Sequence, residues 1–156
     1  MRIFLIMTVL AGALVSLGVA ADPFYLGAWK ITSATVAPWQ AGPPYQSDLT
    51  EMKSLINRIV LIQRQAIVGP RPVACKGPNY QVKNYPAEML FQGAFGEMHR
   101  RARSADPAQV AARLGFCGVS WKTLETGCGN ELDYHFLDPA TAAFGLNNYV
   151  YMMRKQ

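Results

Sequence analysis

Four short segments near the end of the chain constrain the fold most, because each has the length and composition of a β-strand. They cover residues 119–124, 131–136, 142–146 and 149–154, with turn residues between them. Strands this close in sequence pair as antiparallel hairpins. Further strand-like segments occupy residues 25–36, 58–62, 66–68 and 80–85. The pattern predicts an antiparallel meander.

Two helical stretches interrupt these strands. Apolar residues recur at helical spacing around residues 49–57, which predicts a short helix with one buried face. Residues 86–115 are also helical in composition, and Asp106-Pro107 is a strong helix start. We therefore predict a mainly β (α+β) domain: an antiparallel barrel or strongly curled sheet, with a helical insertion around residues 86–115.

The first 21 residues have the pattern of a secretory signal peptide. Arg2 is followed by an apolar stretch, and the small residues Ala20 and Ala21 stand at the exit. Cleavage there leaves residues 22–156 as a single periplasmic or secreted domain without a transmembrane segment. An uncleaved membrane anchor is the alternative, although the fully apolar part is short for a span.

Three cysteines in an exported chain predict one disulfide bridge and one free thiol. Cys75 and Cys128 lie in loop-like stretches, whereas Cys117 follows Phe116 at the start of a strand. If the strands flanking Cys128 pair, Cys117 is carried to the far end of that hairpin, beyond disulfide distance. We predict a Cys75–Cys128 bridge and a buried Cys117 thiol.

Three short motifs resemble those of the lipocalins and related calycin barrels. Gly27-Ala28-Trp29 resembles their G-x-W motif, and Asp133-Tyr134 is similar to their T-D-Y motif, with Leu132 where threonine is usual. Arg154 stands where the family has a late arginine. The resemblance implies a barrel with paired first and last strands, Arg154 packed over Trp29, and an apolar cup for a small ligand. The helical insertion departs from the family, so another small antiparallel α+β fold remains the alternative.

Polar side chains that carry chemistry are few. Glu131, Asp133 and His135 alternate along one strand and share a face, which makes them weak metal-ligand candidates; an outward polar face is the favoured interpretation. Ser120 lacks the second glycine of a nucleophile elbow. Cys117 with a histidine is the other nucleophile candidate. We find no recognisable catalytic constellation and no cofactor motif, so the sequence predicts a non-enzyme.

Two surfaces in the helical insertion are candidates for binding. Four apolar side chains could line a flexible lid over a small ligand, or form a separate core that holds the insertion to the sheet: Met89, Phe91, Phe95 and Met98. Arg100, Arg101 and Arg103 form the densest charge cluster, suited to an anionic envelope surface or to a solvated linker. The net charge is +5, and loss of Arg2 with the leader leaves +4. Export argues against nucleic acid as the partner.

Two function classes remain. The first is an exported binding protein for a small apolar or amphipathic ligand in a barrel cup. The second is a protein-interaction, inhibitor or envelope-associated module without a small-molecule ligand. A pocket lined by phenylalanine and methionine favours the first class, and a filled barrel with an exposed apolar patch favours the second.

Overall fold

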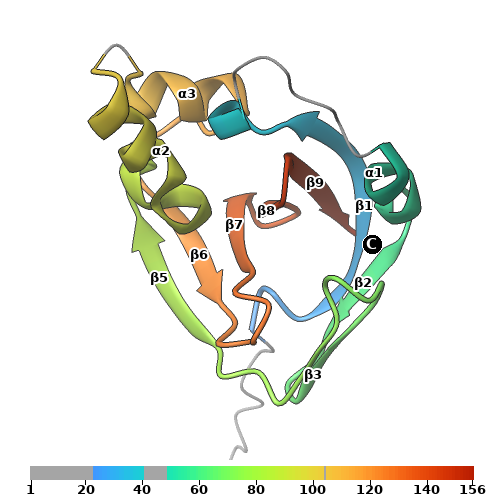
Figure 1. The fold of residues 1–156 in the computed structure, drawn as a ribbon. Coiled ribbons are helices and arrows are strands. Elements are labelled where there is room, and N and C mark those ends of the chain that lie inside the picture. Colours follow the sequence, from blue (N-terminus) through green and yellow to red (C-terminus); the bar gives the residue numbers. More distant parts are fainter. Residues whose placement is uncertain (1–22, 41–48, 104) are drawn as a thin grey trace, which may run out of the picture.

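The computed structural model describes residues 23–40, 49–103 and 105–156. The chain forms a strongly curled antiparallel sheet, and the helical insertion of residues 87–113 packs on its outer side (Figure 1). The strands are β1 (Gly27–Val36), β2 (Ile59–Ile62), β3 (Ala66–Val68), β4 (Cys75–Lys76), β5 (Gln81–Tyr85), β6 (Trp121–Glu125), β7 (Asp133–Asp138), β8 (Thr141–Leu146) and β9 (Tyr149–Lys155). The helical elements are η1 (Pro38–Gln40), α1 (Leu49–Leu55), η2 (Ala87–Met89), α2 (Leu90–Arg101) and α3 (Pro107–Arg113). The predicted fold class is confirmed, including the insertion and the short helix.

The strand order is β4-β3-β2-β1-β9-β8-β7-β6-β5. The first and last strands therefore pair at the centre of the sheet, where Trp29 lies opposite Lys155 and Val36 opposite Tyr149. This pairing was predicted and is confirmed. The edges of the sheet are β4 and β5, which do not pair with each other, so the curl is a half-barrel rather than a barrel closed by a ladder. The resemblance to the lipocalins stays a prediction.

Near one end of the sheet, side-chain bonds connect β4 and the β2–β3 turn to segments that lie next to β5 and β6. The predicted disulfide is confirmed: Cys75 in β4 is bonded to Cys128 in the β6–β7 turn, with a Cα–Cα distance of 6.0 Å. The Tyr80 hydroxyl donates to the Gln63 carbonyl oxygen at 2.8 Å. Figure 1 shows the chain passing from β3 to β5 at this end. A covalent bond and a hydrogen bond thus replace the missing backbone ladder.

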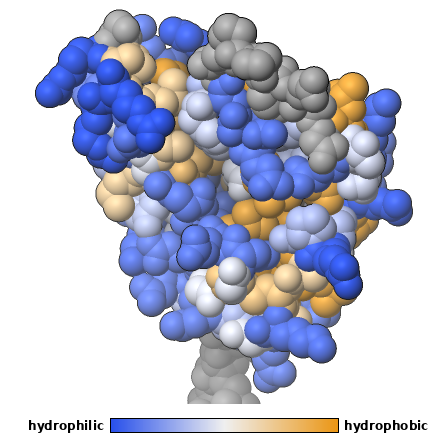
Figure 2. Space-filling view, viewed as in Figure 1, coloured by the Kyte–Doolittle hydropathy of each residue, from blue (hydrophilic) through white to orange (hydrophobic). Residues whose placement is uncertain are grey.

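Aromatic side chains fill the inner side of the curl. Trp29 and Phe136 pack edge to face with ring centroids 5.5 Å apart, and Phe144 stacks on Tyr151 at 5.1 Å. All four rings are buried, and Leu55 of α1 joins the same cluster. Figure 2, viewed from the same side as Figure 1, shows hydrophobic side chains near the middle of the molecular surface, with hydrophilic ones around them. The interior is a packed core.

The insertion forms a second core on the outer face of the sheet. Phe91 and Phe95 of α2 are buried there with Phe116, against strand residues such as Ala143. The start of α3 matches its prediction, because the Asp106 carboxylate accepts a hydrogen bond from the Ala108 N–H at 2.9 Å. Strands β8 and β9 are consequently covered on both faces.

Two predictions need correction or lie outside the structure. Cys117 is exposed rather than buried. The chain reverses at Gly115, whose φ of 90° suits glycine, so Phe116 enters the outer core and Cys117 points to solvent. The predicted signal peptide falls outside the described residues. Across the described ranges, no helix is long and apolar enough to cross a membrane.

Candidate functional site

The four apolar side chains predicted to bind a ligand do not share one surface. Phe91 and Phe95 are fully buried in the outer core, with ring centroids 5.3 Å apart. Met89 is 46% exposed, while Met98 is partly buried beside a groove between η1 and α2. This arrangement matches the alternative interpretation, in which these residues hold the insertion to the sheet.

The three polar residues of the β7 segment also separate. Glu131 lies in the turn before β7 and is exposed, whereas His135 is fully buried beneath α2. The imidazole Nε2 of His135 accepts a hydrogen bond from the Phe91 N–H at 2.9 Å, and its Nδ1 lies 2.8 Å from Thr123 Oγ1. Burial lowers the pKa of His135 to about 3. His135 is therefore a neutral structural group that anchors the insertion.

Asp133 belongs to a charged cluster on the outer faces of β5, β6 and β7. It lies opposite Glu125, whose carboxylate accepts a hydrogen bond from the Tyr85 hydroxyl and pairs with Lys83 Nζ at 2.7 Å. Burial and the Glu125 charge raise the pKa of Asp133 to about 6. Hydrogen bonds from Lys83 and Tyr85 hold the pKa of Glu125 below its ordinary value.

The possible metal ligands of this cluster are the carboxylates of Glu125 and Asp133. Among the residues that the structure describes, no three histidine, cysteine, aspartate or glutamate side chains are grouped so that they could hold a metal ion. The two grooves described below are lined by other residues. The cluster joins β5, β6 and β7 through contacts between their side chains and backbones.

The basic cluster at the end of α2 is partly neutralised by its own helix. Arg100 and Arg101 both pair with Glu97, Arg101 Nε at 2.7 Å, and Arg103 follows the helix as an exposed side chain. The Arg100 and Arg101 hydrogen bonds hold the pKa of Glu97 below its ordinary value. Exposed pairs of this kind add little to stability and reduce the positive charge offered to an anionic surface.

The strongest candidate site is the outer side of β2 and β3, called here the β2–β3 face. Along these strands Val60, Ile62 and Ile67 point into the inner core. The intervening residues point outward, where Ile59 is 44% exposed and Val68 is 52% exposed. An apolar strip of this kind on the outside of a sheet is available to a partner.

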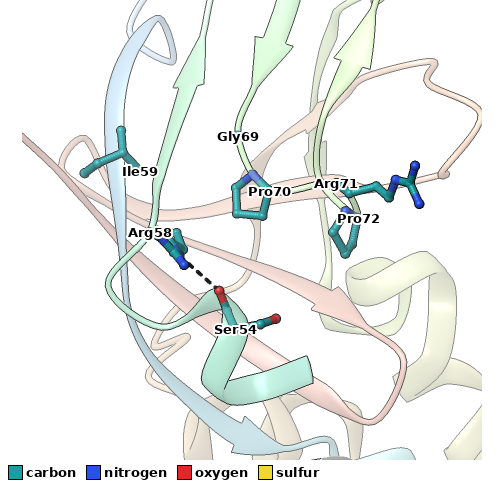
Figure 3. A pocket seen from close by; sticks show the side chains of 7 residues that line it. All are labelled: Ser54, Arg58, Ile59, Gly69, Pro70, Arg71 and Pro72. Carbon is teal, nitrogen blue, oxygen red and sulfur yellow. Dashed lines mark hydrogen bonds between the residues drawn. The ribbon is translucent and has the colours of Figure 1, made fainter. Parts of the chain in front are cut away.

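A groove of about 570 Å³ lies beside this strip, between the end of α1 and the loop after β3 (Figure 3). Its lining residues are Ser54, Arg58, Ile59, Gly69, Pro70, Arg71 and Pro72. The Arg58 Nε donates to the Ser54 carbonyl oxygen at 3.3 Å, while Arg71 points away from it toward solvent (Figure 3). The two guanidinium groups therefore flank the groove and do not converge on one point.

A second groove, of about 370 Å³, begins at the same Gly69 and is lined by residues of β3 and β4. It adds Lys76 to the charged residues of the β2–β3 face. Neither groove has an acidic residue among its described lining side chains. The charge of this face is therefore positive, and its uncharged surface is mainly aliphatic, proline and glycine.

The walls of the first groove are held in place by the core. Val73 is fully buried, and the Asn130 side-chain amide donates to the Pro72 carbonyl oxygen at 3.0 Å. The opposite wall is fixed where the Asn57 N–H donates to the Ile31 carbonyl oxygen at 2.8 Å. Gly69 lies against β2, since a Cβ there would be 3.3 Å from the Ile59 carbonyl oxygen. A groove with fixed walls loses little conformational entropy on binding.

The composition of β2 is a sequence indication of this face. Residues 59–62 are apolar on both faces of a strand, although only one face can enter the inner core. A strand of this composition is either covered on both sides or exposes an apolar strip. Covering helices lie over β8 and β9 instead, so β2 exposes its second face.

No protein-family model matches the chain, and no curated protein and no solved structure matches it. We therefore infer function from the geometry and charge of the described residues.

Proposed function

We propose that this protein is an exported, non-catalytic interaction module whose β2–β3 face binds an extended, acidic segment of a partner protein. The observation that carries the proposal is the combination of exposed Ile59 and Val68 with grooves whose charged lining residues are all basic. Apolar contact supplies the affinity of such an interface, and complementary charge supplies its selectivity and speeds association.

The inner side of the curl supports this choice between the two function classes. Trp29, Phe136, Phe144 and Tyr151 occupy the interior themselves. The exposed apolar side chains of β2 and β3 lie on the outer face instead. A packed interior with an apolar outer strip is the arrangement expected of an interaction module.

An extended segment fits the shape of the face better than a compact ligand does. The two grooves meet at Gly69 and together are lined by residues of α1, β2, β3 and β4. Arg58 and Arg71 stand on opposite sides of the first groove, and Lys76 belongs to the second. Acidic side chains spaced along an extended chain can reach these cations in turn, while apolar side chains between them cover Ile59 and Val68.

Fluorescence anisotropy with labelled nine-residue peptides tests the proposal. One peptide alternates valine with glutamate, and a second alternates valine with lysine. We expect the glutamate peptide to bind and its affinity to fall as salt is added, because exposed charge pairs are screened. The double variant Arg58→Glu/Arg71→Glu should weaken binding at least about tenfold, since reversal turns two attractions into repulsions.

The matched control is Arg103→Glu/Arg113→Glu, which makes the same change of net charge away from the β2–β3 face. Both of these arginines are exposed. The proposal requires this control to bind the glutamate peptide as the unmodified protein does. An equal loss in both double variants, or equal binding of the lysine peptide, contradicts it.

A small amphipathic ligand inside the curl is the second candidate function, and one observation favours it. The hydroxyls of Tyr134 and Tyr149 are buried without a hydrogen-bond partner among the residues that the structure describes. Buried polar groups are nearly always bonded, so a ligand with polar atoms would find two partners there. Native mass spectrometry of protein purified from its own compartment tests this candidate. A retained small molecule supports it, and its absence from protein that also fails to bind amphipathic probes counts against it.

A further inference from the structure

A separate pocket lies at one end of the sheet, where β7 turns into β8. Its volume is about 300 Å³, at the lower end of the range for small-ligand sites. The residues that line it are Phe24, Ser120, Trp121, Lys122, Phe136, Leu137, Asp138 and Pro139. None of them lines the grooves of the β2–β3 face. This pocket, called here the Phe24 pocket, is independent of the proposed function.

The aromatic walls of the Phe24 pocket are held by the inner core. The Phe24 and Phe136 rings pack edge to face with centroids 4.8 Å apart, and Phe136 packs in turn on the buried Trp29. The Lys155 ammonium donates to the Phe24 carbonyl oxygen, which fixes the backbone of that residue. Trp121, at the start of β6, is anchored in the outer core by Phe116, with ring centroids 5.4 Å apart. The walls are therefore formed before a ligand arrives.

The pocket has one positive group available to a ligand. The Lys122 ammonium lies 5.0 Å from the centroid of the Phe24 ring. The residue is exposed, and no ion pair joins it to the other described residues. Asp138, the acidic lining residue, already serves the β7–β8 turn: its carboxylate accepts a hydrogen bond from the Ala140 N–H at 2.7 Å. The positive charge of Arg154 also favours the ionised form of the Asp138 carboxylate.

We propose that the Phe24 pocket binds a small monocarboxylate with an aromatic body. The ring of the ligand packs on the Phe24 and Phe136 rings, and its carboxylate pairs with the ammonium of Lys122, which lies opposite Phe136 on the same face of the sheet. Aromatic walls favour offset or edge-to-face packing of a ring. An ammonium on the rim selects an anionic group over a neutral or cationic one. The Asp138 carboxylate is already engaged by the β7–β8 turn and by the Arg154 charge, so it attracts an amine less strongly than the Lys122 ammonium attracts a carboxylate.

Three probes of equal ring size test the charge selection: 3-phenylpropionate, 3-phenylpropanamide and phenethylamine. Saturation-transfer NMR and Trp fluorescence report binding, because Trp121 lines the pocket. We expect the propionate to bind best and the amine to bind least. Lys122→Gln should weaken propionate binding by about threefold to fivefold, the range for an exposed ion pair, and should leave the amide unchanged. Lys122→Arg should retain the preference for the propionate.

Lys53→Gln is the matched control, because Lys53 is an exposed lysine on α1 outside the pocket. Phe24→Ala should weaken all three probes together, since it removes a wall and leaves the charge. The proposal is overturned if the three probes bind equally, if the amine binds best, or if Lys53→Gln has the same effect as Lys122→Gln. Absence of binding by 3-phenylpropionate at millimolar concentration overturns it as well.

Discussion

The ammonium of Lys155 lies over the indole ring of Trp29, 5.5 Å from the ring centroid. The two residues face each other across the β1–β9 ladder, and the same ammonium donates to the Phe24 carbonyl oxygen. The resemblance to the lipocalins had implied that Arg154 would pack over Trp29. That prediction is wrong by one residue, because Lys155 occupies this position. Arg154 lies opposite Lys30 and is exposed on the other face of the strand.

Removing the Lys155 ammonium should therefore destabilise the fold, whereas removing the Arg154 charge should not. We expect Lys155→Met to lower the free energy of unfolding by about 1–2 kcal/mol, because it loses a cation–π contact and a hydrogen bond. Arg154→Met should change it by less than about 0.5 kcal/mol, as expected for an exposed side chain. Urea unfolding followed by Trp fluorescence measures both. A larger loss in Arg154→Met contradicts the assignment.

The one-residue error has a physical origin in the last strand. β9 carries apolar residues on both faces, with Tyr149, Tyr151 and Met153 inside and Val150 and Met152 under the insertion. Alternation reveals which residues face inward only when one face is polar. The pairing of β1 with β9 depended on strand order and was predictable, but the face of residue 154 was not.

The Cys75–Cys128 bridge should be a major source of stability. It joins residues 53 apart in sequence, and the chain-entropy model gives about 4 kcal/mol for a loop of this length. It also joins β4 to the hairpin beside the other sheet edge, which has no backbone ladder across to β4. We expect Cys75→Ser/Cys128→Ser to lose several kcal/mol of unfolding free energy in urea titrations. The control, Cys117→Ser, should be near neutral; an equal loss there contradicts this account.

Cys117 should react with a thiol reagent in the folded protein, because its side chain is exposed and outside the bridge. We expect one equivalent of maleimide to be incorporated without denaturant, and peptide mapping to place it on residue 117. Cys117→Ala should abolish the labelling. Labelling that appears only after unfolding would show that the thiol is covered.

The insertion shows where sequence patterns stop being informative. Its helical composition and the Asp106 cap were enough to predict α3. They gave no indication that Phe91, Gln92 and Gly93 adopt left-handed backbone angles, with φ of 52°, 55° and 78°. Non-glycine residues rarely adopt this conformation unless contacts hold them there. Here the contacts come from β7 and the turn before it: His135 binds the Phe91 N–H, and the Gln92 amide donates to the Glu131 carbonyl oxygen.

Asp133 should make the fold less stable as pH rises. Its pKa is raised to about 6 in the folded protein, above its ordinary value near 4, so the unfolded chain releases the proton first. The free energy of unfolding therefore falls between about pH 4 and pH 6. We expect Asp133→Asn to gain about 1–2 kcal/mol at pH 7.5, after allowance for solvent screening of a half-buried group, and to gain little at pH 4.

Glu131→Gln provides the comparison for Asp133→Asn, because it removes the same charge from an exposed neighbour. Urea unfolding at half-unit pH steps gives both profiles. A gain of stability for Asp133→Asn that is the same at pH 4 and pH 7.5 would show that carboxylate burial is not its cause.

His135 should have the opposite effect on acid stability. For Nε2 to accept the Phe91 N–H, the neutral imidazole must carry its proton on Nδ1 and donate it to Thr123 Oγ1. Burial lowers the folded pKa to about 3, whereas the unfolded histidine has a pKa near 6.5. The unfolded state therefore takes up a proton first as pH falls. The free energy of unfolding should decline from about pH 6.5 toward pH 3.

Because Asp133 acts in an overlapping pH range with the opposite sign, the histidine effect is best measured in the Asp133→Asn background. We expect that variant to lose stability steadily below about pH 6.5. Adding His135→Gln should cost about 2–4 kcal/mol at pH 7.5, since the Phe91 N–H and the Thr123 hydroxyl are buried around a changed partner. It should also flatten the acid limb, which is the fall in the free energy of unfolding from about pH 6.5 toward pH 3. Adding His99→Gln instead, at the chain's other histidine, should preserve the limb. An acid limb that is equally steep with and without His135 would show that the buried imidazole does not control it.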